Sequence, residues 1–289
     1  MRYAGSARRV RICLAAQAPV EYARAVESLE ISAKYRAVTA RTGLISCQDF
    51  LKYFSPDKLA GQTTVFVKPA ELSCDTDAPI AVFYKQYEYR TPSWRFLGRA
   101  SKAWREFQSY AAFERMGIAC AEPIAAGEMR DWLGRLKRAF IVTRAVPKAK
   151  TLIEFFQQVC ADRKSVVARE LRAALLRQLA GMTRRLHDQN YVHTDLYWRN
   201  ILVTQLASGE PVMWWIDCPR GRFRRFYRRA GRIKDLASLD KGAAKFCTRG
   251  ERVAFVKHYL GKTKLDAEGK RWIRDTLTYR QQRWPDDGH

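Results

Sequence analysis

The sequence predicts an α+β protein in two parts, the first rich in β-structure and the second mainly helical. Two observations support this prediction. Segments rich in Val, Ile, Phe and Tyr and bounded by turn residues are concentrated before residue 146, as is typical of strands. Apolar residues at helical spacing dominate from about residue 165 onwards. A chain of 289 residues is long enough for one large domain or for two lobes.

The first part contains three predicted strands and one predicted helix. Residues 35–90 are expected to be β-structure, and the turn-rich segment 73–79 separates the strand-like segments 64–68 and 80–89, which predicts a hairpin. Residues 101–116 have apolar positions near a 3.6-residue period, and Gly117 follows, which predicts a helix. Residues 139–145 are again strand-like. Pro147 follows this strand, and a boundary is expected at 144–150.

The second part begins with a long predicted helix. Its apolar residues recur three or four positions apart, so that one face packs while the arginines occupy the others; they are Val167, Leu171, Leu175, Leu179, Met182 and Leu186. Two short strands, 201–204 and 212–216, follow with a turn at 208–211 between them. Helical patterns then continue to Trp284, and residues 286–289 are expected to fray.

The composition describes a folded and very basic chain. There are 53 Lys and Arg against 29 Asp and Glu, a formal net charge of +24, and 47% of residues are hydrophobic. This excludes collagen-like and wholly disordered classes. The excess positive charge predicts an anionic partner: nucleic acid, an anionic membrane, or a phosphorylated or carboxylated sugar.

No apolar segment is long enough to span a bilayer. Residues 1–20 are basic and then apolar, but Gln17 interrupts the apolar part and no clean cleavage site follows, so a signal peptide is not expected. The seven cysteines are scattered and form no CxxC pair. We therefore expect free thiols in a reducing compartment rather than a zinc site.

The loop after the long helix contains the pattern His193-x-Asp195-x4-Asn200, and Asp217 follows the next two strands. Phosphoryl transfer requires a carboxylate near the attacking hydroxyl and oxygen ligands for Mg²⁺. The loop supplies the carboxylate and one ligand, and Asp217 supplies the second. Chance produces this spacing in a chain of this composition about once in 700. The alternative is a structural loop in which His193 and Asp195 satisfy backbone groups and Asn200 caps a turn.

The sequence at this point resembles the lipopolysaccharide kinase (Kdo/WaaP-type) family of bacterial core-sugar kinases, within the protein-kinase-like fold. The resemblance covers roughly residues 65–240. It rests on the segments 82–85, 101–107, 116–128, 195–202, 215–217 and 234–239. It implies a two-lobed fold with an N-lobe at 1–143, a hinge at 144–150 and a C-lobe at 151–289.

The resemblance also implies roles for individual residues. Asp195 would be the catalytic base, and Asn200 and Asp217 would hold magnesium. Lys85 would contact the phosphates of ATP and form an ion pair with Glu106. Residues where the N-lobe meets the hinge would contribute to the nucleotide site; these are Thr143, Arg144 and Ala145. Lys68 is a competing choice, because Val65-Phe66-Val67-Lys68 resembles Val82-Phe83-Tyr84-Lys85. We prefer Lys85 because it is nearer to Glu106 in the sequence.

The chain departs from protein kinases at several positions. No G-x-G-x-x-G precedes Lys85, so the segment that covers the phosphates is not assigned. Thr194 replaces the arginine of the H-R-D motif, Asp217-Cys218-Pro219 replaces D-F-G, and A-P-E is absent. An arginine beside the catalytic Asp usually binds an activation-loop phosphate. Its absence favours a small-molecule kinase that is not switched by phosphorylation.

Residues 220–234 carry eight basic residues and no acidic one. One interpretation is a solvated charged helix or a nucleic-acid patch. The other is that its arginines bind carboxylates and phosphates of an anionic glycolipid, with substrate contacts from Arg220, Arg222, Arg224 and Arg225. Basic and aromatic residues are also mixed at 89–104, which suits a membrane interface.

We therefore expect ATP-dependent phosphorylation of a heptose or Kdo hydroxyl in the lipopolysaccharide inner core, by a cytoplasmic enzyme peripheral to the inner membrane. An aminoglycoside-type kinase is a poorer choice, because a protein of charge +24 is a poor electrostatic match for a cationic substrate. An inactive scaffold that binds an anionic partner explains the charge but not the three polar residues of the motif. A nucleic-acid partner is not expected.

Overall fold

The structure, a computed structural model, describes residues 26–54, 65–74, 77–93, 96–224, 226 and 228–285. Expectations for residues 1–20 and 286–289 lie outside this part of the chain. The chain forms two compact units, one made of the residues up to Phe107 together with Glu122–Ala145, the other of Gln108–Ala121 and the residues from Val146 onwards. The second unit thus includes 108–121, which the predicted hinge at 144–150 leaves in the first lobe. The lobe boundaries themselves stay a prediction.

The first unit is built on an antiparallel five-stranded sheet in the order β1-β4-β5-β3-β2. Its strands are β1 (Val26–Ile31), β2 (Val65–Cys74), β3 (Asp77–Ser93), β4 (Pro123–Arg130) and β5 (Leu136–Arg144). The predicted hairpin is present as β2 and β3, in which Val67 pairs with Lys85 and Leu72 with Ile80. The predicted strand at 139–145 is β5.

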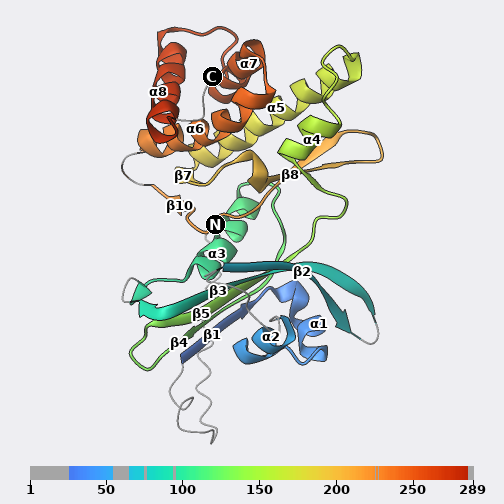
Figure 1. The fold of residues 1–289 in the computed structure, drawn as a ribbon, viewed down its shortest axis with the longest axis vertical. Helices are drawn as coiled ribbons and strands as arrows, with labels where there is room; N and C mark the ends of the chain where they lie inside the picture. Colours follow the sequence, from blue (N-terminus) through green and yellow to red (C-terminus); the bar gives the residue numbers. More distant parts are fainter. Residues whose placement is uncertain are drawn as a thin grey trace, which may run out of the picture. The chain divides into compact units, whose positions relative to one another are not determined.

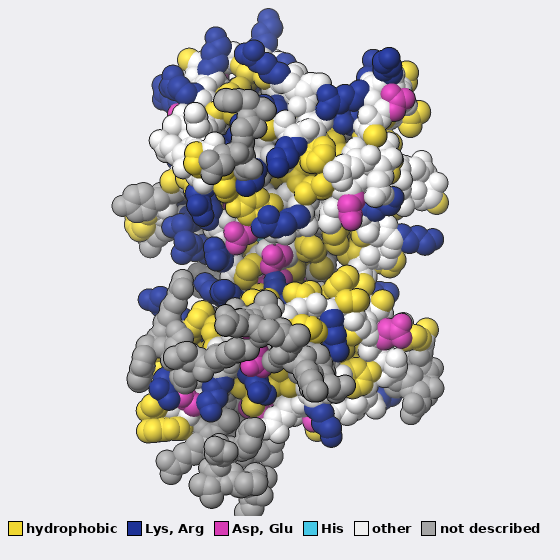
Figure 2. All heavy atoms as spheres, in the orientation of Figure 1, with side chains coloured by type: hydrophobic (Ala, Val, Ile, Leu, Met, Phe, Trp, Pro, Cys, Tyr) yellow, Lys and Arg dark blue, Asp and Glu magenta, His cyan; other side chains and the backbone are white. Residues whose placement is uncertain are grey.

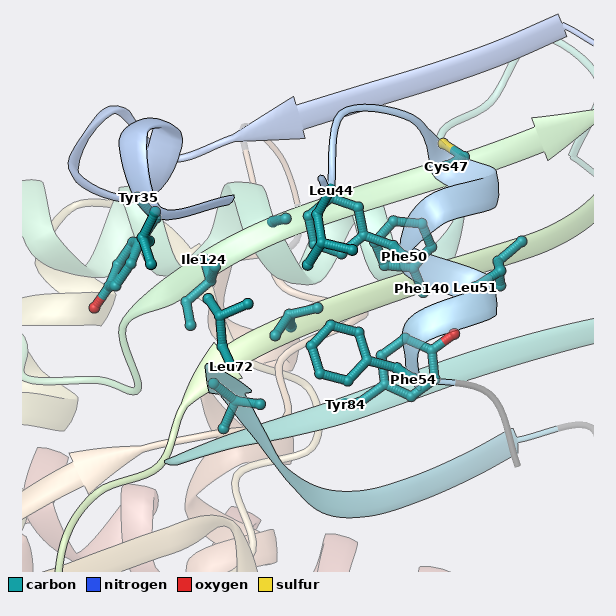
Figure 3. Packing of buried hydrophobic residues seen from close by; sticks show 14 of the residues in the cluster. Tyr35, Leu44, Cys47, Phe50, Leu51, Phe54, Leu72, Tyr84, Ile124 and Phe140 are labelled. Carbon is teal, nitrogen blue, oxygen red and sulfur yellow. The ribbon is translucent and has the colours of Figure 1, made fainter. Parts of the chain in front are cut away.

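Two short helices cover one face of this sheet, α1 (Arg36–Arg41) and α2 (Cys47–Phe54), after the 3₁₀ turn η1 (Ala33–Tyr35). Phe50 of α2 lies 5.1 Å from Phe140 and Phe54 lies 5.1 Å from Tyr84, between ring centroids. Figure 3 shows these rings packed between α2 and the strands. The expectation of β-structure from residue 35 was therefore wrong for residues 35–54. The buried residues of α2, spaced 3, 1 and 3 apart, make a helical face.

The predicted helix at 101–116 is α3 (Lys102–Arg115), and its residues up to Phe107 belong to this unit. Figure 1 shows the beginning of α3 on the side of the sheet opposite α1 and α2. Neighbouring residues of a strand point to opposite faces. Tyr84 is therefore buried against α2, while Lys85 reaches Glu106 of α3.

The second unit is mainly helical, as expected (Figure 1). Its helices are α4 (Leu152–Gln158), α5 (Val166–Asp188), α6 (Arg228–Phe246), α7 (Arg249–Leu260) and α8 (Ala267–Arg283). The predicted apolar face of α5 is buried from Leu175 to Leu186, whereas Val167 at its first turn is exposed. One core cluster joins α5 to α6, α7 and α8 through Ala180, Leu236, Tyr259 and Trp272.

Short strands complete the second unit. A three-stranded sheet in the order β6-β8-β9 contains β6 (Lys150–Thr151), β8 (Ile201–Gln205) and β9 (Pro211–Trp215). The strands β8 and β9 are the predicted hairpin, and Ile201 pairs with Trp215. A separate two-residue pair joins β7 (Tyr191–Val192) to β10 (Arg222–Phe223). Residues 119–121 hydrogen-bond to the backbone of Trp215, which accounts for their place in this unit.

No described helix is both long enough and apolar enough to cross a membrane. The thiols of Cys47, Cys160 and Cys247 are free. Burial raises the pKa of Cys47 and of Cys247 to about 12. These two thiols therefore stay protonated and unreactive at neutral pH.

Candidate active site

Asp195 lies in a loop that its own backbone and the Asn200 side chain hold closed. The loop runs from β7 through the 3₁₀ turn η3 (Trp198–Asn200) into β8. The carbonyl oxygen of Asp195 accepts hydrogen bonds from Tyr197 N and from Asn200 Nδ2, both at 2.9 Å. The Asp195 side chain is 23% exposed. Asn200 thus caps the turn, as in the interpretation of this segment as a structural loop. Its Oδ1 is the oxygen of the side chain that can still accept a hydrogen bond or bind a cation.

The backbone before Asp195 is fixed by a buried carboxylate that sequence reasoning did not assign. Asp235 of α6 accepts hydrogen bonds from the amides of His193 and Thr194, each at 2.7 Å, and is fully buried. Its Oδ2 also lies 3.3 Å from Nε2 of His187. Thr194 has a left-handed φ of 69°, a strained conformation that such contacts support. One feature of the sequence could have indicated a buried carboxylate here: an acidic residue stands directly before the apolar Leu236 and Ala237 in a predicted helix.

The His193 ring is a core side chain and not a polar participant in the loop. It stacks on Phe113, with ring centroids 5.8 Å apart and planes 12° apart, and meets Trp215 edge-on at 5.8 Å. Neither ring nitrogen has a hydrogen-bond partner among the described residues. Desolvation lowers the pKa of His193, although the carboxylate of Asp235 opposes this shift. The ring is therefore neutral at neutral pH.

The β8–β9 hairpin brings Asp217 beside Asn200. The amide of Ile216 donates to the carbonyl of Asn200 at 3.0 Å, and Asp217 is the next residue. Asp217 has a left-handed φ of 57°, and its amide donates to the Tyr110 hydroxyl at 3.1 Å. The hairpin argument from the sequence thus agrees with the local geometry.

The chemistry of these donors fits magnesium. Asp217 offers carboxylate oxygens and Asn200 an amide oxygen, the hard ligands that Mg²⁺ prefers. Among the described residues no group of three or more His, Cys, Asp and Glu could hold a metal. Magnesium in nucleotide sites is usually bound by one or two protein groups together with substrate phosphates and water. Two protein ligands are therefore enough.

Within the first unit, Lys85 pairs with Glu106. Lys85 Nζ lies 3.1 Å from Glu106 Oε2, and the two side chains are 15% and 4% exposed. The Tyr87 hydroxyl donates to the same oxygen at 3.2 Å. Lys68, on the neighbouring strand β2, forms no ion pair with any described residue. The Lys85–Glu106 contact is the one that the resemblance implies.

Thr143, Arg144 and Ala145 are at the end of β5. Thr143 is buried. The amide of Arg144 donates to the Glu122 carbonyl at 2.8 Å, and the amide of Ala145 donates to the Ala81 carbonyl at 2.9 Å. Both amide hydrogens are therefore used inside the first unit. If these residues hold a nucleotide, they do so through other atoms.

The arginines of the basic segment 220–234 lie in different surroundings. Arg220 Nε lies 3.7 Å from Asp195 Oδ2, Arg222 is exposed on β10, and the Arg224 amide donates to the Asn190 carbonyl at 2.7 Å. Arg225 lies outside the described residues. Two arginines of α6 have partners within the protein, which the sequence interval does not reveal: Arg229 pairs with Asp275 at 2.6 Å, and Arg232 donates to the His187 carbonyl.

The chain is similar to known proteins both in sequence and in fold. Residues 89–259 match the model of the lipopolysaccharide kinase (Kdo/WaaP) family. The chain is 29% identical over 126 residues to a 3-deoxy-D-manno-octulosonic acid kinase of Haemophilus influenzae (strain 86-028NP), which is 43% of this chain and 48% of the relative. It is 31% identical over 117 residues, 40% of this chain and 44% of the relative, to the kinase of the same name from Actinobacillus succinogenes. The match thus spans about half the length of these curated relatives.

The fold is also that of a solved structure described as WaaP in complex with acyl carrier protein. The TM-score is 0.65 at 19% identity, and the match covers 90% of this chain and 99% of that one. This confirms the predicted α+β, protein-kinase-like fold. The family match covers more than half of the chain. The chain belongs to the lipopolysaccharide kinase (Kdo/WaaP) family.

Proposed function

We propose that this protein transfers the γ-phosphoryl group of ATP to a sugar hydroxyl, Kdo or heptose, of the lipopolysaccharide inner core. The observation that carries the proposal is the joining of Asp195, Asn200 and Asp217 by one loop and one hairpin, in a chain that belongs to this kinase family. A structural loop has no need of all three side chains. We favour Kdo, because the relatives reported above are named as kinases of that sugar and its carboxylate complements a basic protein.

Each residue has a separate task in the proposed reaction. The partly exposed Asp195 orients the acceptor hydroxyl and accepts its proton. Asp217 and Asn200 hold Mg²⁺, which neutralises charge on the phosphates when it is bound. Lys85, kept in place by Glu106 and Tyr87, contacts the nucleotide phosphates. Asp235 touches no reactant; it fixes the two residues that precede Asp195.

We place the reaction on the cytoplasmic side of the inner membrane, because ATP is available there and the acceptor is a glycolipid. The net charge of +24 supports association with an anionic membrane surface. It also argues against a cationic aminoglycoside as acceptor. A nucleic-acid partner is disfavoured because only the basic charge of the chain favours it. The residues of the proposed site do not.

The test is transfer of labelled phosphate from Mg-ATP to a set of acceptors by the purified chain. The set contains Kdo-bearing lipid A, the same lipid extended with heptose, an aminoglycoside and water alone. We expect labelling of a core acceptor, with fragmentation by mass spectrometry placing the phosphate on Kdo. Asp195→Asn should abolish transfer, whereas Asp188→Asn, an exposed aspartate of α5, should not. Labelling of the aminoglycoside alone, or of no acceptor, would contradict the proposal.

A further inference from the structure

The turn that follows Asp217 holds an arginine against the proposed catalytic carboxylate. Arg220 Nε lies 3.7 Å from Asp195 Oδ2, and the two side chains are 58% and 23% exposed. An ion pair this long and this exposed contributes little to stability. Stability therefore does not explain why the chain puts a cation at this position.

The backbone around Arg220 is fixed on both sides. Before it, the Cys218 carbonyl accepts a hydrogen bond from Ser109 at 2.8 Å, and Ser109 accepts one from Tyr191 at 2.8 Å. After it, a Cβ at Gly221 would lie 2.4 Å from Cys218 Sγ and 2.5 Å from the Tyr191 hydroxyl. Only glycine allows so close an approach.

The strand that follows adds a third attachment. Arg222 and Phe223 form β10 and pair with Val192 and Tyr191 of β7, immediately before the catalytic loop. The Phe223 ring also meets the Tyr191 ring edge-on at 4.9 Å. The segment that bears Arg220 is therefore anchored to the strand that leads into the Asp195 loop, and the two side chains are positioned by the same element.

No other cation of the described chain forms an ion pair with Asp195. The other cationic side chain of this loop is Arg199. It is exposed, and its guanidinium lies 4.4 Å from the centroid of the Tyr197 ring. Arg220 is thus the cation that the described structure offers at the proposed base.

We propose that Arg220 is a catalytic residue that binds the phosphoryl group during its transfer. This inference rests on the proposed function. The acceptor oxygen forms a bond to the γ-phosphorus while the bond from that phosphorus to the bridging oxygen breaks. ADP leaves with the electron pair, and the hydroxyl proton goes to Asp195. Negative charge is then spread over the three equatorial oxygens of the phosphoryl group.

The position of Arg220 suits this task. A base lies about 3 Å from the oxygen whose proton it takes, and that oxygen lies roughly 3–3.5 Å from the phosphorus it attacks. A guanidinium already beside Asp195 is therefore within reach of the equatorial oxygens. Its planar set of donors binds phosphate oxygens well. The exposed contact with Asp195 is weak enough to be exchanged for the phosphoryl group.

The first experiment needs no acceptor. Unfolding temperatures of the full chain are measured with Mg-ADP and with Mg-ADP plus aluminium fluoride, a mimic of the transferring phosphoryl group. We expect the fluoride complex to stabilise the wild type more than Mg-ADP does. Arg220→Ala should lose this extra stabilisation while it keeps the shift with Mg-ADP, and Arg220→Lys should retain part of it. Arg177→Ala, which removes an exposed arginine of α5, should behave as the wild type.

The second experiment separates catalysis from acceptor binding. For Arg220→Ala we expect a fall in kcat on the order of 10²- to 10³-fold, KM values for ATP and acceptor nearly unchanged, and partial recovery with added guanidinium ion. A raised acceptor KM with an unchanged kcat, or equal extra stabilisation by fluoride in Arg220→Ala and the wild type, would overturn the proposal. Failure of the lipopolysaccharide acceptor with an intact fluoride effect would instead count against the proposed substrate alone.

Discussion

The side chains of the proposed site depend on backbone contacts for their positions. Asp195 is fixed by Asn200 and Asp235, and Asp217 by Tyr110 and by the residue before it, Ile216. The spacing in the sequence predicted that Asn200 and Asp217 come together, because a loop followed by a hairpin returns the chain to its starting point. It did not predict Asp235, because that contact crosses 41 and 42 positions of sequence and no local pattern encodes it.

Asp217→Asn tests the metal role of this residue. Asparagine tolerates the left-handed backbone of Asp217 and keeps the same shape, so we expect the unfolding temperature to change by no more than about 2 °C. The carboxylate charge that binds magnesium is lost, so magnesium-dependent transfer should disappear. Activity measured over a magnesium titration checks this. Full activity in the variant would contradict the assignment of Asp217 as a magnesium ligand.

The two candidate lysines are distinguished by paired replacements. Lys85→Ala should weaken nucleotide binding or turnover, because it removes the proposed phosphate contact and leaves the buried Glu106 without its cation. Lys68→Ala should have a mild effect on both. Nucleotide KM and kcat for the two variants are the measurement. Greater sensitivity at Lys68 would show that the assignment to β3 is wrong by one strand.

The buried His193 ring predicts a pH dependence of stability. Its folded pKa is below the ordinary value, so below about pH 6.5 the unfolded chain takes up a proton that the folded chain does not. The stability that the neutral His193 ring contributes is therefore fully present above that pH. It is lost as the pH falls, and the free energy of unfolding decreases by at most about 1.4 kcal/mol per pH unit. Unfolding free energies at pH 7.5 and 5.5 should differ less in His193→Leu than in the wild type. An equal difference in both would contradict a neutral buried ring.

At the scale of elements, the sequence was informative where the pattern was long or bounded by clear turns. The 23-residue helix α5 and the β8–β9 hairpin are examples. The expectation of β-structure was wrong at 35–54, where the short helices α1 and α2 follow one another. Cys47, Phe50, Leu51 and Phe54 carry the helical spacing, but α2 has only eight residues. Its apolar face is explained by packing on the sheet, which a local pattern does not show.

The packing of α6 against the Asp195 loop gives a prediction at this scale. A Cβ at Gly242 of α6 would lie 2.5 Å from the Trp198 ring, which is itself packed between Phe156 and Phe246. Gly242→Ala should therefore destabilise by about 1–3 kcal/mol. Gly181→Ala, in the interior of α5 with no atom within 4 Å of the new Cβ, should stabilise by up to about 1 kcal/mol. Urea unfolding compares the two, and equal effects would contradict the close approach of α6 to Trp198.

For the whole molecule, positive charge is the dominant property. Lys and Arg side chains are spread over the face seen in Figure 2, and Asp and Glu are few there. The composition predicted an anionic partner, but not which arginines are compensated within the fold. Asp275 of α8 pairs with Arg229, although the two are 46 positions apart. Arg229 and Arg232 of α6, which have partners within the fold, are thus poorer candidates for binding the acceptor.

The central claim is that this chain phosphorylates the lipopolysaccharide core through Asp195. The most direct measurement is mass spectrometry of lipopolysaccharide from cells that lack the gene and from the same cells supplied with the wild type or with Asp195→Asn. We predict that one core phosphate is missing without the gene, returns with the wild type and stays missing with Asp195→Asn. An unchanged core phosphate in all three strains, or its return with Asp195→Asn, would contradict the claim.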